Sequence, residues 1–425
     1  MKSANHVVSF REATIHGQAP EKGLYFPVEL PKYTSKQLDY LKKLSLTELG
    51  FELMKPFVGK EIPKKTLFEI MEETLCFPLV VKPLDSKVAV LELFHGPTLS
   101  FKDVGSRFMS RCLKYFLESE NRQITVLVAT SGDTGSAVAS GFYKVPGINV
   151  VILYPKGKVS NIQELQLTTL GENIHSLAIE GNFDDCQNLV KEAFSDQELS
   201  QKIKLTSANS INVARWLPQQ IPYFYTWQQF QQVIEVVAIP SGNFGNIAAA
   251  VLAMNTGLPI KKLLAACNAN DIIPHYLSTG QYIIKPTQFT LSNAMDISQP
   301  SNFVRIEHIF NNNLPVLKEK LSAVSVSDND TILALKTLYK KYNYIADPHG
   351  AVAYQALQHF SATFKRSIFV ETAHPIKFAD IVEKELQIKI PVHKDVEKLH
   401  QLPQKFQVIN NHFNTLKEWL LSQKF

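Results

Sequence analysis

Cysteine is scarce in this chain of 425 residues, and its few cysteines lie far apart. No Cys-x-x-Cys pair occurs among them: Cys76, Cys112, Cys186 and Cys267. Neither a zinc knuckle nor a disulfide scaffold is therefore expected, and the thiols are expected to be reduced and mostly buried.

Long apolar runs and basic tracts are also missing. No apolar run approaches the ~20 residues needed to span a bilayer, and the N-terminus lacks the apolar core of a signal peptide. The 44 Lys and Arg residues against 39 Asp and Glu give a net charge of only +5, without a cluster suited to nucleic acid. We expect a soluble cytoplasmic protein with no membrane or nucleic-acid partner, whose mild positive charge suits small anions.

The common nucleotide-binding and hydrolase motifs are absent as well. Gly157-Lys158 is followed by Val159, so there is no Walker A loop, and no G-x-G-x-x-G fingerprint occurs. A G-x-S-x-G nucleophile elbow and an H-E-x-x-H metal site are also missing. No metal site is expected.

What the chain does contain is a regular alternation of strand and helix patterns. Apolar, β-branched runs at 124–129 and 150–154 are typical of buried strands, and each is followed by a helical pattern. A second unit of this kind opens at 233–239. This alternation predicts an α/β protein with parallel sheets covered on both faces.

The chain length favours two or three domains. We expect an N-terminal helical cap at 1–90, a first α/β domain at 91–230, and a second at 231–425 that ends in a helical tail; these segments can be discontinuous in space. Ser35 is the expected N-cap of a helix over 36–44, and residues 209–230 are expected to form one long, aromatic-rich helix. Residues 270–315 show no clear pattern.

Two loops share one design. Ser131–Gly135 follows the strand at 124–129, and Ser241–Asn246 follows the strand at 233–239; each precedes an Ala-rich helix. Small residues at a strand-to-helix junction leave backbone N–H groups free to bind an anion, and the helix dipole adds to the attraction. One such loop is weak evidence, because tight turns use glycine for steric reasons. The matched pair predicts two anionic groups bound across a cleft.

Lys102 lies where a helix is expected to begin. A strand pattern at 88–93 leads into the turn Gly96-Pro97, and the helical pattern runs over 104–116. The positive end of the helix dipole disfavours the ammonium form of a lysine there, which suits a neutral amine that forms a Schiff base. The alternative is an ordinary solvated lysine in a first helical turn.

Six stretches together carry a family resemblance. They are His95–Asp103 (HGPTLSFKD), Ala129–Gly135 (ATSGDTG), Asn209–Asn212 (NSIN), Pro240–Gly245 (PSGNFG), Thr290–Asp296 (TLSNAMD) and Glu371–Pro375 (ETAHP). They resemble the pyridoxal-phosphate enzymes of the tryptophan-synthase-β fold, and among these the threonine synthase family most closely. The similarity covers nearly the whole chain, in order.

The resemblance implies two three-layer, parallel-sheet domains of fold type II after the N-terminal cap, with pyridoxal 5′-phosphate as cofactor. Lys102 would form the Schiff base, and Thr372 would place its hydroxyl at the pyridine nitrogen. Asp133 stands where most relatives outside threonine synthase carry Asn, near the cofactor 3′-oxygen and the substrate carboxylate. The cofactor phosphate would lie in the loop formed by Gly242, Asn243, Phe244, Gly245 and Asn246.

The implied reaction converts O-phospho-L-homoserine and water to L-threonine and phosphate, the last step of threonine biosynthesis, in a monomer or homodimer. The phosphate group of the substrate needs a cationic binding site. Arg215 is the first candidate for this site and Lys156 is the second. Other residues expected at the substrate are Ser207, Asn209 and Ser210 beside Arg215, and Ser131 and Thr134 at the carboxylate. A dehydratase or phospho-lyase of the same fold, or a non-catalytic cofactor-binding homologue, is the alternative.

Overall fold

Buried, β-branched strands form two separate sheets. The computed structural model describes residues 1, 6–118, 123–230, 233–360, 364 and 366–423. One sheet has six strands in the order β1 (Val80–Pro83), β2 (Val88–Glu92), β10 (Ser367–Glu371), β7 (Ile234–Pro240), β8 (Ile260–Cys267) and β9 (Leu321–Ser325). The other has five, in the order β11 (Gln407–Asn410), β5 (Ile174–Glu180), β4 (Ile148–Pro155), β3 (Ile124–Ala129) and β6 (Leu205–Thr206).

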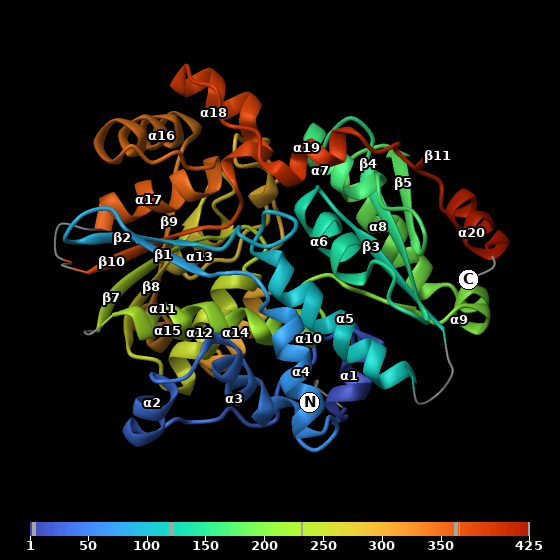
Figure 1. The fold of residues 1–425 in the computed structure, drawn as a ribbon, viewed down its shortest axis with the longest axis horizontal. Helices are drawn as coiled ribbons and strands as arrows, with labels where there is room; N and C mark the ends of the chain where they lie inside the picture. Colours follow the sequence, from blue (N-terminus) through green and yellow to red (C-terminus); the bar gives the residue numbers. More distant parts are fainter. Residues whose placement is uncertain (2–5, 119–122, 231–232, 361–363, 365, 424–425) are drawn as a thin grey trace.

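Nearly all the strand pairs are parallel, as the alternating pattern predicts. Among the described strands, the one antiparallel pair joins β1 to β2 at the edge of the six-stranded sheet. The two sheets lie side by side, each with helices on both faces (Figure 1). This arrangement confirms the expected α/β fold class, with the antiparallel edge strand β1 as an addition.

Each sheet contains strands from more than one of the three expected sequence segments. Strand β2 spans the expected boundary at residue 90 and pairs with β10 in the six-stranded sheet. Strand β11, near the C-terminus, pairs with β5 in the five-stranded sheet. Each half of the molecule therefore contains chain from more than one of the three segments.

The N-terminal segment is helical. It consists of α1 (Phe10–His16), α2 (Ser35–Leu41), α3 (Leu46–Val58) and α4 (Lys64–Thr74), which lie together at the lower edge of Figure 1. The N-cap of α2 is Thr34 rather than Ser35, because Thr34 forms a reciprocal capping box with Gln37. Helices α1 and α4 both contact α5 (Lys102–Glu118), which runs through the middle of the molecule.

Helices flank the sheets on both sides. The five-stranded sheet carries α6 (Asp133–Phe142), α7 (Asn161–Thr168), α8 (Phe183–Ser195), α9 (Gln197–Lys202) and α20 (Phe413–Ser422). The six-stranded sheet carries α12 (Gly245–Thr256), α13 (Ile272–Thr279), α14 (Phe303–Ile309), α15 (Leu314–Lys320), α16 (Asp328–Tyr342) and α17 (Pro348–Phe360). Two of these, α13 and α14, lie in the 270–315 stretch for which the sequence offered no clear pattern, and α15 begins at its end.

The expected long helix over 209–230 is wrong. The segment divides into α10 (Val213–Trp216), a 3₁₀ turn η1 (Leu217–Gln220) and α11 (Ile221–Gln229). Pro218 and Pro222 lie near the start of η1 and of α11. Because proline has no N–H and its ring crowds the preceding turn, these two prolines favour a break in the helix.

The C-terminal stretch is likewise more than a helical tail. After β10 come the 3₁₀ turn η4 (Pro375–Phe378), α18 (Ala379–Leu386) and α19 (Lys394–His400), followed by β11 and α20. Helix α19 contacts α7, so the chain crosses from one half to the other along the top of Figure 1. Helical periodicity gave no sign of β11, whose side chains are mostly exposed.

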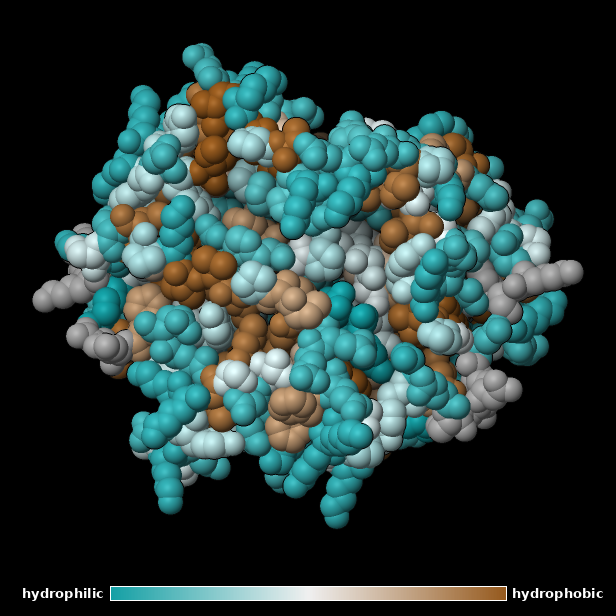
Figure 2. Space-filling view, in the orientation of Figure 1, coloured by the Kyte–Doolittle hydropathy of each residue, from teal (hydrophilic) through white to brown (hydrophobic). Residues whose placement is uncertain are grey.

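The face of the molecule shown in Figure 2 is mostly hydrophilic, with apolar residues in separate patches and weakly polar residues toward the middle. Within the described residues, no helix combines the length and apolar character needed to cross a membrane.

Candidate active site

Lys102 is the first residue of α5, and the end of β10 holds it in place. The N–H of Phe101 donates to the carbonyl of Thr372 at 2.9 Å, and the N–H of His374 donates to the carbonyl of Leu99 at 3.0 Å. Ser100 and Ala373 form an antiparallel bridge between these bonds. This clamp brings Lys102 close to residues that lie some 270 positions later in the chain.

The side chain of Lys102 is largely enclosed, with 17% of its surface exposed, and its Nζ lies 3.9 Å from Oδ2 of Asp133. Burial above all lowers the pKa of Lys102, to about 8; Asp133 opposes this decrease, while Lys377 and Arg215 contribute to it. A lysine of this kind loses its proton far more readily than one in water, as a nucleophilic amine requires.

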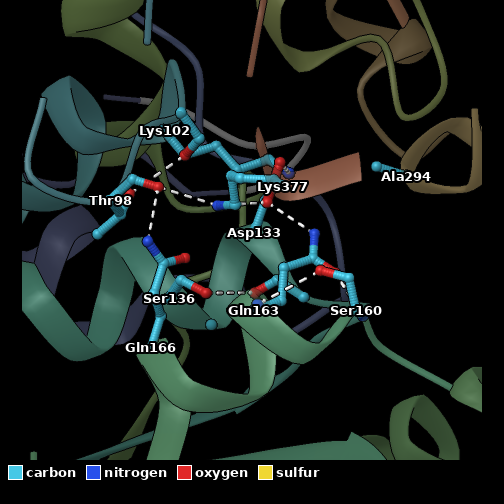
Figure 3. A network of polar contacts seen from close by, with 12 residues as sticks. Thr98, Lys102, Asp133, Ser136, Ser160, Gln163, Gln166, Ala294 and Lys377 are labelled. Atoms are coloured by element: carbon cyan, nitrogen blue, oxygen red, sulfur yellow. Dashed lines mark hydrogen bonds and ion pairs between the residues drawn. The ribbon is translucent and has the colours of Figure 1, made fainter. Parts of the chain in front are cut away.

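Asp133, at the start of α6, is held on its other oxygen. Its Oδ1 accepts a hydrogen bond from Nε2 of Gln163 at 2.8 Å and lies 2.7 Å from Nζ of Lys377. Figure 3 shows these groups converging on Asp133 from η4 and α7. Burial alone would raise the pKa of Asp133, but Lys377 and Lys102 hold it well below its usual range.

Asp103 organises the turn that precedes Lys102. Its carboxylate accepts from the N–H of Thr98 at 3.0 Å and from the Thr98 hydroxyl at 2.7 Å. Gly96 lies so close that an added Cβ would come within 2.4 Å of Oδ2 of Asp103. Burial raises the pKa of Asp103 to about 6, against the hydrogen bonds from Thr98. The His95–Asp103 stretch is therefore a tightly packed floor beneath Lys102.

The loop Ser241–Asn246 joins β7 to α12 and is packed on both sides. A Cβ at Gly242 would lie 2.5 Å from Cα of Met295, in the 3₁₀ turn η2 (Asn293–Met295). Phe244 adopts a left-handed backbone conformation, with φ 60°, and packs edge-on against Phe303. The loop therefore presents the N-terminus of a twelve-residue helix, whose first N–H groups have no partner within the helix.

Side chains of this loop connect it to the segment around Ser210. Nδ2 of Asn243 donates to Oγ of Ser210 at 3.1 Å, and Nδ2 of Asn302 donates to the same oxygen at 2.8 Å. The Tyr223 hydroxyl donates to Oδ1 of Asn246, while the buried Nδ2 of Asn246 has no hydrogen-bond partner among the described residues.

Arg215 is buried beneath that segment. Its Nη1 donates to the carbonyl of Ala208 at 2.6 Å, whereas its Nε, like Oδ1 of Asn209, is buried without a partner in the described part of the chain. Burial lowers the pKa of Arg215 to about 10, and Asp103 opposes this. Ser207 accepts from the N–H of Asn209 at 3.2 Å. The segment thus gathers a buried cation and unused polar atoms.

The remaining predicted residues divide into two groups. Ser131 and Thr134 are half-buried on either side of Asp133, in a loop that Thr130 holds by accepting from the N–H groups of Gly132 and Gly135 at 2.9 and 2.8 Å. Lys156, by contrast, has 51% of its side chain exposed and pairs with Glu180 at 3.6 Å. Within the described part of the chain, the ion-pair partner of Lys156 is Glu180, which does not belong to the Lys102 cluster.

Comparison with known proteins is decisive at this point. Residues 78–371 match the family model of pyridoxal-phosphate dependent enzymes, residues 2–75 that of the threonine synthase N terminus, and residues 350–420 that of the threonine synthase C-terminal region. The threonine synthase of Escherichia coli K12 is 44% identical over 95% of this chain and 94% of its own length. That of Buchnera aphidicola from Acyrthosiphon pisum is 43% identical over 100% and 99%.

Solved structures agree. The crystal structure of threonine synthase from Escherichia coli superimposes with a TM-score of 0.92 at 42% identity, covering 97% of this chain and 96% of that one. A pyridoxal-phosphate-bound threonine synthase from Brucella melitensis gives 0.92 at 32% identity, covering 98% and 96%. The chain belongs to the threonine synthase family. It is therefore an enzyme, a lyase that depends on pyridoxal phosphate.

The residues present fit this cofactor of the threonine synthase family. The amine of Lys102 is nearly enclosed and its pKa is lowered. The N-terminus of α12 offers free N–H groups to a phosphate, and Gly242 leaves no room for a side chain that would fill the approach. Thr372, 7% exposed, follows β10 at the clamp beside Lys102. An aldehyde carrying a phosphate is what such a donor set binds.

Sequence reasoning missed Lys377 and Gln163, which both contact Asp133. Lys377 follows the Glu371–Pro375 stretch by two residues, but a lysine in a short helical turn is normally exposed. Gln163 lies in the first turn of the short helix α7, where it also forms the capping box with Ser160. Nothing in the sequence distinguishes either residue from a surface residue, because their roles depend on packing against α6.

Proposed function

We propose that this member of the threonine synthase family converts O-phospho-L-homoserine and water to L-threonine and phosphate. The observation that supports this most directly is the largely enclosed Lys102, held at the head of α5 beside Asp133 and the end of β10. Full-length identity above 40% to proteins of that name adds to it. The substrate is a small molecule, and its exact identity is the part that needs testing.

Pyridoxal phosphate supplies an electron sink for the charge that develops on the amino acid when a proton is removed from it. In this proposal, Lys102 removes protons from Cα and Cβ and returns protons to Cγ and Cα, because its Nζ is released when the substrate binds. A pKa of about 8 keeps a useful fraction of Lys102 in the neutral form at neutral pH. Phosphate leaves from Cγ, and water adds at Cβ.

The substrate phosphate needs a seat apart from that of the cofactor phosphate. Arg215 and Asn209 both have buried polar atoms without a partner in the described structure, and Ser207 and Ser210 lie on the same segment. A guanidinium with an unused N–H suits a phosphate oxygen. Arg215 is therefore the favoured candidate over Lys156, whose partner is the surface residue Glu180.

The two half-buried hydroxyls beside Asp133, those of Ser131 and Thr134, would hold the substrate carboxylate. They lie at the N-terminus of α6, where the helix dipole favours an anion. The cofactor phosphate would bind the N-terminus of α12, so two helix ends would hold two of the three anionic groups. We also propose that the protein works in the cytoplasm and that it is a monomer or homodimer. Light scattering of the purified enzyme would test the oligomeric state.

Product analysis tests the proposed reaction. Purified protein loaded with pyridoxal phosphate is supplied with O-phospho-L-homoserine, and threonine, phosphate and 2-oxobutyrate are measured. We expect threonine and phosphate in equal amounts. Release of 2-oxobutyrate instead would identify a dehydratase or phospho-lyase of the same fold, and the absence of any product would favour a homologue without this activity.

Replacement of the lysine tests its role. Lys102→Ala should abolish the visible absorbance of the loaded enzyme and lower turnover by about 10³-fold, since no other amine replaces the general base. Lys389→Ala is the matched control, because Lys389 is a 90% exposed lysine that pairs with Glu383. If Lys102→Ala kept both absorbance and turnover, the assignment of Lys102 would be wrong.

A further inference from the structure

Lys377 is an unusual lysine, because its side chain is fully buried, with 0% exposed. Lysine is almost never fully buried unless it is paired. Its Nζ lies 2.7 Å from Oδ1 of Asp133 and donates to the carbonyl of Thr98 at 2.9 Å. Both partners belong to the floor and wall of the site, and Lys377 itself comes from η4, about 240 residues beyond Asp133 (Figure 3).

The three charged groups are arranged in a row. Asp133 uses one oxygen for Lys377 at 2.7 Å and turns the other toward Lys102 at 3.9 Å. Gln163 adds a neutral donor on the Lys377 side, at 2.8 Å. Among the described residues, Arg215 also acts on Lys102, and Asp103 also interacts with Lys377.

We propose that Lys377 is a positioning residue of the site. It holds the carboxylate of Asp133 in place and takes up its negative charge, so that Lys102 is released as a neutral amine rather than held as an ammonium ion. The proposal rests on the proposed role of Lys102 as the lysine that bonds the cofactor.

The physical reason is a competition for one carboxylate. In a site with little water, an unpaired aspartate 3.9 Å from a lysine would stabilise the ammonium form and raise the lysine pKa. A second cation in closer contact with the same carboxylate cancels most of that attraction, and it repels a positive charge on Lys102 as well. Removal of Lys377 leaves Asp133 with Lys102 as its remaining cation partner among the described contacts.

The test measures how pH controls the capture of cofactor by the full-length protein. Pyridoxal phosphate is added to the apoprotein, and the rate at which its visible absorbance develops is followed from pH 6 to 10. The rate should rise as Lys102 loses its proton, with a midpoint near its pKa of about 8. This readout does not depend on turnover.

Three variants distinguish an electrostatic role from simple packing. In Lys377→Met, the midpoint should move up by about one pH unit, because Asp133 then acts on Lys102 alone. In the double variant Lys377→Met with Asp133→Asn, it should return to the wild-type value or fall below it. In Asp133→Asn alone, it should fall below the wild-type value. Lys389→Met is the charge control, since Lys389 is 90% exposed and pairs with Glu383.

The outcomes separate this inference from the proposed function. An unchanged midpoint in Lys377→Met, or one that stays raised in the double variant, overturns the role of Lys377 while leaving that of Lys102 intact. If Lys377→Met alone fails to fold, the double variant and Asp133→Asn carry the test, and a midpoint that does not fall in Asp133→Asn overturns the proposal. Capture of cofactor by Lys102→Ala would instead refute the proposed function itself.

Discussion

At the scale of single residues, the site depends on a glycine that lets another side chain reach Asp133. Gly132 has φ 133°, and a Cβ there would lie 2.3 Å from Cδ of Gln163. Gln163 is the residue that donates to Asp133 at 2.8 Å. A side chain at position 132 would therefore strain the backbone and displace this donor from the carboxylate.

We expect Gly132→Ala to destabilise the protein by about 2–4 kcal/mol, through backbone strain and overpacking together. Turnover should fall as well, because Asp133 loses a partner. Gly157→Ala is the matched control: Gly157 has φ 68° but nothing within 4 Å of an added Cβ, so only the backbone term of about 1–2 kcal/mol should remain. Thermal melting and steady-state kinetics of both variants check this, and equal effects in the two would contradict it.

At the scale of elements, the C-terminal strand and helix complete the five-stranded half. Strand β11 pairs with β5 along one edge, and Leu416 and Leu420 of α20 pack into the apolar cluster that contains Leu127 and Leu153. An uncovered parallel edge and apolar face would otherwise contact water. Helix α20 is therefore part of the core of this half, and β11 covers one edge of its sheet.

Leu416→Ala should lower the free energy of unfolding by about 2–5 kcal/mol, because a fully buried leucine leaves a cavity. Leu402→Ala should change it by about 0.5 kcal/mol or less, since Leu402 is 46% exposed. Thermal or urea unfolding measures both. Comparable losses in the two variants would show that α20 adds nothing specific to the core.

At the scale of the whole molecule, side-chain contacts as well as chain crossings join the parts of the structure. Arg305 of α14 donates hydrogen bonds to the carbonyl of Tyr25 at 2.8 Å and to that of Ile211 at 2.7 Å. The guanidinium lies over the ring of Trp216 at 4.3 Å. The N-terminal segment, the α10 region and the six-stranded half are thus fastened at one buried point.

We therefore expect the isolated fragment 91–230 not to fold as a unit, although it contains four of the five strands of its sheet. It would lack β11 and α20, and the N-terminal helices that cover α5. Circular dichroism of the fragment should show no cooperative thermal transition, in contrast to the full chain. A sharp transition in the fragment would mean that this half is an independent domain.

The elements that the sequence predicted correctly share one property: their signals are local. Apolar runs, helical periodicity and glycine turns located β3 at 124–129, β7 and the start of α5 at Lys102. Both glycine loops also lie between strand and helix, as expected. Such signals depend on neighbours within a few residues, so they can be read without knowledge of the fold.

The errors had two different origins, one local and one distant. The 3₁₀ turn η1 interrupts the expected helix near two prolines of the same segment, whereas β11 is a strand because the edge of the five-stranded sheet offers it hydrogen bonds. Periodicity does not report an edge that another part of the chain supplies.

By itself, the sequence determined the fold class, the family, the cofactor and the lysine at the helix start. Only the tertiary structure decided which charges surround that lysine. Lys377 and Asp133 are about 240 residues apart in the sequence, yet Nζ of Lys377 lies 2.7 Å from Oδ1 of Asp133. The protonation of Lys102 depends on burial and on charges a few ångströms away, and those are set by how β10, η4 and α6 pack together.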